Sequence, residues 1–168
     1  MDVLEREVAN LRQHGFDVAC VDVTREPLPR QFDVIIGGEV IEHLDAPGRF
    51  LQSCSAMLKP GGRLAITAPN PWYANAVFKN CLRRYTFVDS ADHVAWYDAS
   101  TLFEIGQRCG LRLDRFTGIG GAQPRTLGAK LLFQLRPLLV GLGISPEFFA
   151  KSIIYEFLRD EQIATGGL

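Results

Sequence analysis

The sequence predicts an α/β fold built on a doubly wound sheet. Short apolar runs alternate with stretches whose apolar residues recur at helical spacing, which is the order of strands and helices in such sheets. The run at 32–37 is apolar on both faces, as parallel strands covered by helices require. Proline and glycine clusters at 59–62 and 69–71 separate the elements.

The first elements lie before residue 38. A helix is predicted over 3–14, because apolar residues recur at helical spacing and Gly15 follows them. A short apolar strand at 18–21 then ends at Asp22, and a second strand covers 32–37.

Three further helical segments and three strands complete the expected fold. Asp45 is predicted to be the N-cap of a helix with five buried apolar residues: Phe50, Leu51, Cys54, Met57 and Leu58. A third strand is expected at 63–67. Asp98 or Ser100 should cap the next helix, and the remaining elements are a strand at 111–117, a helical stretch at 127–142 and a last strand at 152–158.

No repeat, linker or low-complexity tract divides the 168 residues, so a single domain over 1–168 is expected, with 120–148 as a helical insertion.

The 18 basic and 19 acidic side chains give a net charge of −1, so no overall field attracts nucleic acid and no DNA partner is expected. The four cysteines are far apart and the N-terminus is charged, which indicates a cytoplasmic protein with reduced thiols. Lys130, Arg136 and Pro137 interrupt the leucine-rich stretch, so no transmembrane segment is expected.

Four segments occur in the order and spacing of one enzyme family. They read "GFDVACVDV…PLPRQFDVII", "GEVIEHLDAP", "LKPGGRLAITAPNP" and "DHVAWYDASTLFEIGQRCGLRL". Together they resemble the class I S-adenosylmethionine-dependent methyltransferases over roughly residues 2–117. The resemblance implies a Rossmann-like, mostly parallel sheet with an antiparallel last strand, and S-adenosyl-L-methionine as cofactor.

The same resemblance implies where the cofactor binds, because ligands of open α/β sheets lie beyond the carboxyl ends of the strands. Asp22 would reach the adenine amino group and Asp2 the ribose. The less favoured alternative for Asp22 is a plain turn aspartate, whereas Asp2 can equally be a frayed terminal residue. The other expected cofactor-binding residues are Val23, Gly37, Gly38 and Glu39.

The chain departs from the family at its start. The glycine-rich loop that should lie upstream of Asp2 is not found, so a truncated, N-terminally incomplete domain is expected, lacking its first strand and binding the cofactor weakly by itself. The strand at 32–37 would then have an unpaired edge, which a homo-oligomer or a partner chain would cover. A circular permutation, with "FTGIGGAQP" as the glycine loop, is disfavoured because no acid-ended strand follows it.

The acidic segment "GGEVIEHLDAP" carries the strongest chemical signal. In a helical turn Glu39, Glu42 and His43 would share one face, and with His93 they would suit Mg²⁺ or Mn²⁺. The pattern E-x-x-E-H is similar to that of the ubiquinone-biosynthesis O-methyltransferases and the small-RNA 2′-O-methyltransferases. Two alternatives to a metal site stay open. These residues could line a pocket that holds no metal, or His43 could act by itself as a general base.

These observations favour a methyltransferase that transfers a methyl group to an oxygen of a small-molecule acceptor, with His43 and Glu39 as catalytic residues. An RNA end is a less favoured acceptor. The alternative is a non-catalytic remnant that binds a partner. Four aromatic residues are expected either to line the acceptor pocket or to pack in the core: Trp72, Tyr73, Trp96 and Tyr97. For the stretch at 127–142, simple burial is favoured over a lid or a lipid-docking surface.

Overall fold

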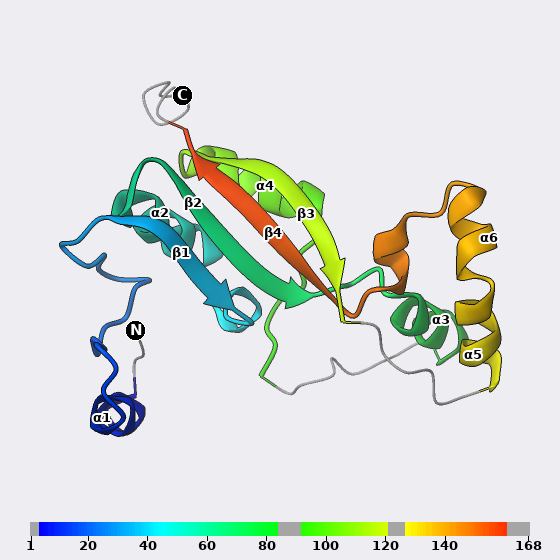
Figure 1. Ribbon diagram of the computed structural model, residues 1–168, viewed down its shortest axis with the longest axis horizontal. Helices are drawn as coiled ribbons and strands as arrows, with labels where there is room; N and C mark the ends of the chain where they lie inside the picture. Colours follow the sequence, from blue (N-terminus) through cyan, green and yellow to red (C-terminus); the bar gives the residue numbers. More distant parts are fainter. Residues whose placement is uncertain (1–3, 84–91, 121–126, 161–168) are drawn as a thin grey trace.

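The computed structural model describes residues 4–83, 92–120 and 127–160. Their centre is a four-stranded sheet with the order β1-β2-β4-β3 (Figure 1). The strands are β1 (Phe32–Gly38), β2 (Leu58–Pro69), β3 (Leu111–Ile119) and β4 (Ser152–Arg159). β1 and β2 are parallel, whereas β4 is antiparallel to both of its neighbours. The predicted mostly parallel sheet with an antiparallel last strand is therefore confirmed, and β1, β2 and β3 all end at one edge.

Helices cover one face of this sheet and extend beyond its carboxyl edge. The helical segments are α1 (Glu5–Gln13), η1 (Ile41–His43), α2 (Pro47–Met57), α3 (Ala74–Arg83), α4 (Ala99–Arg108), α5 (Leu127–Gln134), α6 (Arg136–Gly141) and η2 (Pro146–Phe149). Figure 1 shows α2 and α4 behind the sheet, and α3, α5, α6 and η2 past the ends of β2 and β3. Among the described residues, no helix has the length and apolar character needed to cross a membrane.

The core lies between the sheet and helices α2 and α4. The five residues of the predicted stripe in and after α2 are all buried, and they pack with Leu64, Ile66 and Phe157 of the sheet. Each such side chain contributes about 1.5–3 kcal/mol when fully buried. On the opposite face of β1, Val34 is 55% and Ile36 78% exposed, and β1 is an edge strand of the described sheet, as expected.

The predicted cap of α2 and the predicted strand at 18–21 are both wrong. Asp45 is not the N-cap of α2: Ala46 occupies that position without a side-chain cap, because Pro47 takes the first helical turn, where its missing N–H costs nothing. The predicted strand at 18–21 reduces to an isolated bridge at Cys20, because a strand requires a continuous hydrogen-bonded neighbour and none is present in the described sheet.

β2 starts five residues earlier than the predicted 63–67 strand. Its register with β1 shifts between Phe32 and Val34, so the Lys-Pro-Gly-Gly segment is an irregularity within the strand pair. Gly62 is needed there, since a Cβ atom would lie 2.8 Å from the backbone oxygen of Lys59.

The loop before β4 is tied to the end of β2 by a buried side chain. The Nδ2 group of Asn70 donates to the carbonyl oxygens of Glu147 (2.8 Å) and Ala150 (2.9 Å), and its Oδ1 accepts from the backbone N–H of Trp72. This amide holds η2 at the carboxyl edge of the sheet.

Candidate active site

The site begins where β1 ends. Glu39 has a φ of 50°, a left-handed conformation that costs a non-glycine residue about 1–2 kcal/mol. Its N–H donates to the carbonyl oxygen (3.2 Å) and the hydroxyl oxygen (3.0 Å) of Thr67 at the end of β2. This strained residue turns the chain out of the sheet and into η1.

The two glycines before Glu39 have different surroundings. A Cβ atom on Gly37 would lie 3.2 Å from the ring of Phe50 and 3.4 Å from Ile66, so this glycine allows α2 to pack on β1. A Cβ atom on Gly38 would meet only the Thr67 hydroxyl, at 3.8 Å. Open space for a ligand is therefore found at Gly38.

A cluster of three ligand-type side chains lies directly beyond this turn. Glu42, His43 and His93 each place a carboxylate oxygen or ring nitrogen within 4.8 Å of the others. Two backbone bonds hold the His93 segment against η1: the N–H groups of Val94 (2.8 Å) and Ala95 (3.3 Å) both donate to the Glu42 carbonyl oxygen. We refer to Glu42, His43 and His93 as the η1 cluster.

Glu42 is unusual because its carboxylate is buried without a donor. The residue is 1% exposed, and among the described residues neither carboxylate oxygen has a hydrogen-bond partner. Burial raises its pKa, and the nearby charge of Glu39 adds to this shift. Its own backbone N–H, His43 and His93 act in the opposite direction. A buried, unpaired carboxylate beside two imidazoles is a site that favours a cation.

His43 is oriented by a residue that the sequence analysis did not assign. Its Nδ1 lies 3.1 Å from the carbonyl oxygen of Asp92 and 3.6 Å from the Asp92 carboxylate. With Nδ1 protonated towards this carbonyl, Nε2 carries the lone pair that can accept a proton or bind a metal. The rings of His43 and His93 meet edge to face, with centroids 4.8 Å apart.

The structure brings together three of the four predicted metal ligands. Glu39 is not part of the η1 cluster, because its left-handed conformation and the three-residue η1 replace the regular helical turn that would have aligned it. It nevertheless lies near enough to raise the pKa of Glu42.

The predicted adenine-binding residue, Asp22, is engaged locally. Its carboxylate accepts from the N–H (2.9 Å) and hydroxyl (2.6 Å) of Thr24 and pairs with Arg25 at 3.1 Å. The Thr24 bonds lower its pKa. Val23 packs against the core, and the predicted ribose ligand Asp2 lies outside the described residues.

The four aromatic residues near this edge divide into two pairs. Tyr73 and Tyr97 are buried, whereas Trp72 and Trp96 are exposed. The Trp72 indole N–H donates to the Asp98 carboxylate at 3.3 Å, and Asp98 also caps α4, as predicted. Of the two roles predicted for these four residues, the tyrosines therefore pack in the core, and only the tryptophans are accessible to a ligand.

Asp92 and Thr67 are the site residues that sequence reasoning missed. Asp92 directly precedes His93, so its proximity to a candidate ligand was a usable signal. Thr67 acts through its position opposite Gly38 in the β1–β2 register, which no local pattern reveals.

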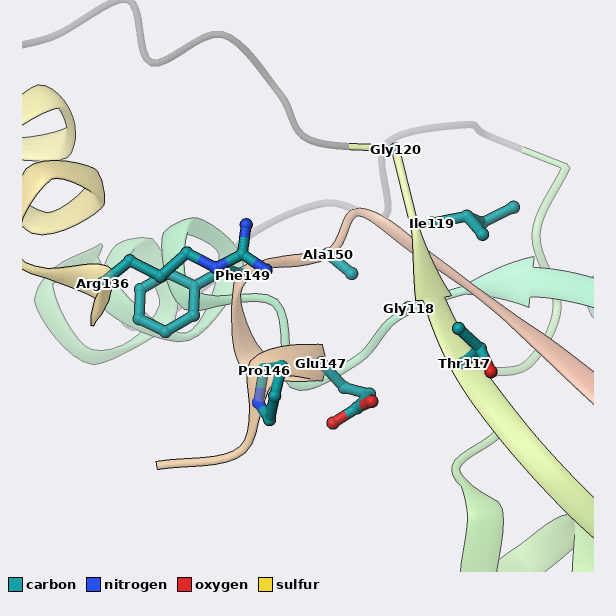
Figure 2. Close-up of a pocket in the computed structure, with 9 residues that line it drawn as sticks. All are labelled: Thr117, Gly118, Ile119, Gly120, Arg136, Pro146, Glu147, Phe149 and Ala150. Atoms are coloured by element: carbon teal, nitrogen blue, oxygen red, sulfur yellow. The ribbon is translucent and has the colours of Figure 1, made fainter. Parts of the chain in front are cut away.

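A hollow of about 290 Å³ lies at the end of β3 (Figure 2). The end of β3 forms one side, and residues of α6 and η2 form the other: Thr117, Gly118, Ile119, Gly120, Arg136, Pro146, Glu147, Phe149 and Ala150. The Arg136 guanidinium lies 5.7 Å from the centre of the Phe149 ring, and the Glu147 carboxylate accepts a hydrogen bond from Ser145.

Comparison with known proteins identifies relatives for most of the chain. The family model described as "Methyltransferase domain" matches residues 4–115. The ubiquinone biosynthesis O-methyltransferase of Nitrobacter winogradskyi is 40% identical over 67 residues, which are 40% of this chain and 24% of that protein. The protein of the same name from Coxiella burnetii is 28% identical over 118 residues, covering 66% of this chain and 50% of that protein.

Solved structures share the fold. A SAM-dependent methyltransferase from Archaeoglobus fulgidus superimposes with a TM-score of 0.60 at 16% identity, over 94% of this chain and 73% of that one. The chain spans at most about half the length of the two curated relatives described above. Because the family match extends over most of its length, the chain belongs to the methyltransferase-domain family.

Proposed function

We propose that this chain belongs to an S-adenosylmethionine-dependent methyltransferase that methylates an oxygen of a small-molecule acceptor. The observation that carries the proposal is the η1 cluster, positioned at the carboxyl end of β1 within the region that matches the methyltransferase family. The O-methyltransferase names of the relatives support oxygen as the accepting atom. They also favour an enzyme over a non-catalytic remnant.

The methyl donor would lie along the carboxyl edge of the sheet, with Gly38 allowing its close approach. Glu39 would line this site, and its backbone conformation fixes where its carboxylate emerges. Asp22, Val23, Gly37 and Asp2 complete the proposed cofactor-binding set, with Asp22 exchanging its bonds to Thr24 for the ligand.

In the reaction, the acceptor oxygen attacks the methyl carbon, the O–C bond forms and the C–S bond of the sulfonium breaks. The acceptor hydroxyl loses its proton, and His43 Nε2 is the proposed recipient, because the Asp92 carbonyl fixes Nδ1 as the donor. Glu42 would stabilise the resulting imidazolium. Most of the rate enhancement would come from positioning the two substrates in line.

The donor set of the η1 cluster fits Mg²⁺ or Mn²⁺. Glu42 supplies an orphaned buried carboxylate, and His43 and His93 supply two nitrogens within reach of it. When bound, such a cation would lower the pKa of an acceptor hydroxyl. With a cation bound, His43 would serve as one of its ligands rather than as the base.

We further propose that residues 1–168 form a single domain, with 120–148 as an insertion that carries α5, α6 and most of η2. Residues of the insertion line part of the hollow at the end of β3, at the same edge of the sheet as the η1 cluster. A cytoplasmic location is part of this proposal.

The experiment is a methyl-transfer assay with labelled S-adenosylmethionine and a panel of catechols and phenols, run on this chain and on an upstream-extended protein, with and without chelator. His43→Ala should abolish transfer, whereas His14→Ala, which changes an exposed histidine at the end of α1, should not. Activity that resists chelator would assign proton transfer to His43 alone. Absence of transfer from the extended protein to every acceptor would refute the proposal.

A further inference from the structure

The α5–α6 segment is apolar on two opposite sides. The N–H of Leu135 donates to the Leu131 carbonyl oxygen (3.0 Å), and that of Leu139 donates to the Leu135 carbonyl oxygen (2.9 Å). The helical path therefore continues through the junction between the two helices, despite Pro137. One side of this path packs inward, where the Phe133 ring meets Phe149 edge to face at 5.7 Å.

The other side carries a row of exposed leucines. Leu131, Leu135, Leu138 and Leu142 follow each other at intervals of four, three and four residues, so they form one stripe. They are 57%, 41%, 60% and 74% exposed. The simple burial expected for this stretch is therefore wrong for its outer side. We call these four residues the leucine stripe.

The segment that carries the stripe is positively charged. Residues 127–146 contain Lys130 and Arg136 and no acid. The remainder of the chain holds 16 basic and 19 acidic residues. The segment that exposes the leucines is therefore positive, in a chain whose net charge is −1.

We propose that the leucine stripe and its flanking cations form a docking surface for an anionic lipid bilayer. The leucines would enter the boundary between head groups and acyl chains, and Lys130 would remain at the head groups, as in interfacial amphipathic helices. A nucleic acid would match the charge but not four exposed leucines. A second copy of the chain would match the leucines but would bring the cations together. The bilayer satisfies both features.

The surface does not depend on methyl transfer, so it goes beyond the proposed function and is tested separately. The experiment is co-sedimentation of the purified chain with vesicles of phosphatidylcholine alone or of equal parts phosphatidylcholine and phosphatidylglycerol. We expect binding to the anionic vesicles, weakened by salt and much weaker on the neutral ones.

Two variants, each with a matched control, separate the contribution of the leucines to vesicle binding from that of the positive charge. Leu138→Asp with Leu142→Asp should lower the affinity for anionic vesicles by roughly tenfold or more, because two exposed side chains lose their apolar contact. Phe16→Asp changes a residue that is equally exposed, at 61%, but lies beyond α1, and should bind as wild type. Lys130→Glu should cost roughly fivefold or more, and Lys151→Glu, outside the stripe, much less.

Circular dichroism verifies that each variant folds, which is expected since the changed side chains project into solvent. Equal binding of wild type and the double leucine variant would overturn the proposal. Three other results would also overturn it: no vesicle binding by the wild type, tight binding of single-stranded RNA without vesicle binding, or a wild-type dimer that the leucine variant dissociates.

Discussion

Replacing Glu42 by glutamine removes one buried charge and keeps the size of the side chain. Among the described residues the carboxylate has no hydrogen-bond partner, so in the absence of a cation its charge opposes folding. Leaving a buried polar group unsatisfied costs about 1–3 kcal/mol, and more for a charged one. We therefore expect Glu42→Gln in chelator to be more stable than wild type by about 1–3 kcal/mol at mildly alkaline pH. That corresponds to roughly 2–4 °C in Tm per kcal/mol for a protein of this size.

The extra stability of Glu42→Gln over wild type should decrease as the pH is lowered. Because burial raises the pKa of Glu42, the folded protein holds a proton over a pH range in which the unfolded chain has released it. Wild type therefore gains stability as the pH falls through the raised pKa towards the ordinary value of 4.5, and the advantage of the variant shrinks over that window. Glu39, His43, His93 and Tyr97 also face this carboxylate, so their variants should shift the window.

Urea unfolding at a series of pH values, with chelator throughout, measures this difference. Glu104→Gln, on an exposed position of α4, is the matched control and should show little change. In a parallel series without chelator, addition of Mn²⁺ should offset this difference, because a cation at one hundred times its Kd stabilises the wild type by about 2.7 kcal/mol and finds no carboxylate in the variant. A variant that is less stable than wild type at every pH in chelator would show that the Glu42 carboxylate is bonded, and would refute the reasoning.

Three further changes test the packing around the site. Asn70→Ala should lower the free energy of unfolding by about 2–4 kcal/mol, because it leaves two buried carbonyl oxygens without donors, as measured by urea unfolding. Gly106→Ala would place a Cβ atom 2.8 Å from the Phe157 ring and should cost about 1–3 kcal/mol, whereas Gly141→Ala has nothing within 4 Å and should be neutral or slightly stabilising. Burial raises the pKa of Cys54 to about 12, so a thiol reagent should label the exposed Cys20 in the native protein and Cys54 only after unfolding.

Most of the fold could be predicted from short sequence patterns, because these patterns show which side chains are buried and where helices begin. The stripe of α2, the Asp98 cap and the apolar run of β1 were all found, since each depends on residues a few positions apart. The prediction of a strand at 18–21 was wrong because a strand depends on a hydrogen-bonded neighbour, often distant in the sequence, and apolar character alone does not provide one.

The sequence predicted which residues form most of the candidate site, but it did not predict how they are arranged. Glu42, His43 and His93 were named from a family pattern, and the structure brings them together. Glu39 was placed on the same helical face, but its left-handed φ takes it out of line. That conformation follows from the bonds to Thr67, a partner 28 positions away, which no spacing rule contains.

The position of β4 also determines the order in which the sheet can form. β4 is the last of the described strands along the chain, yet it lies between β2 and β3 and is hydrogen-bonded to both. Its partner residues in β2, such as Leu64 opposite Phe157, are separated from it by most of the chain, so the sheet has a high contact order. Folding is then slow, since long loops must close before these contacts form. Until β4 docks, β2 and β3 each keep an unpaired edge, which the partly folded chain exposes.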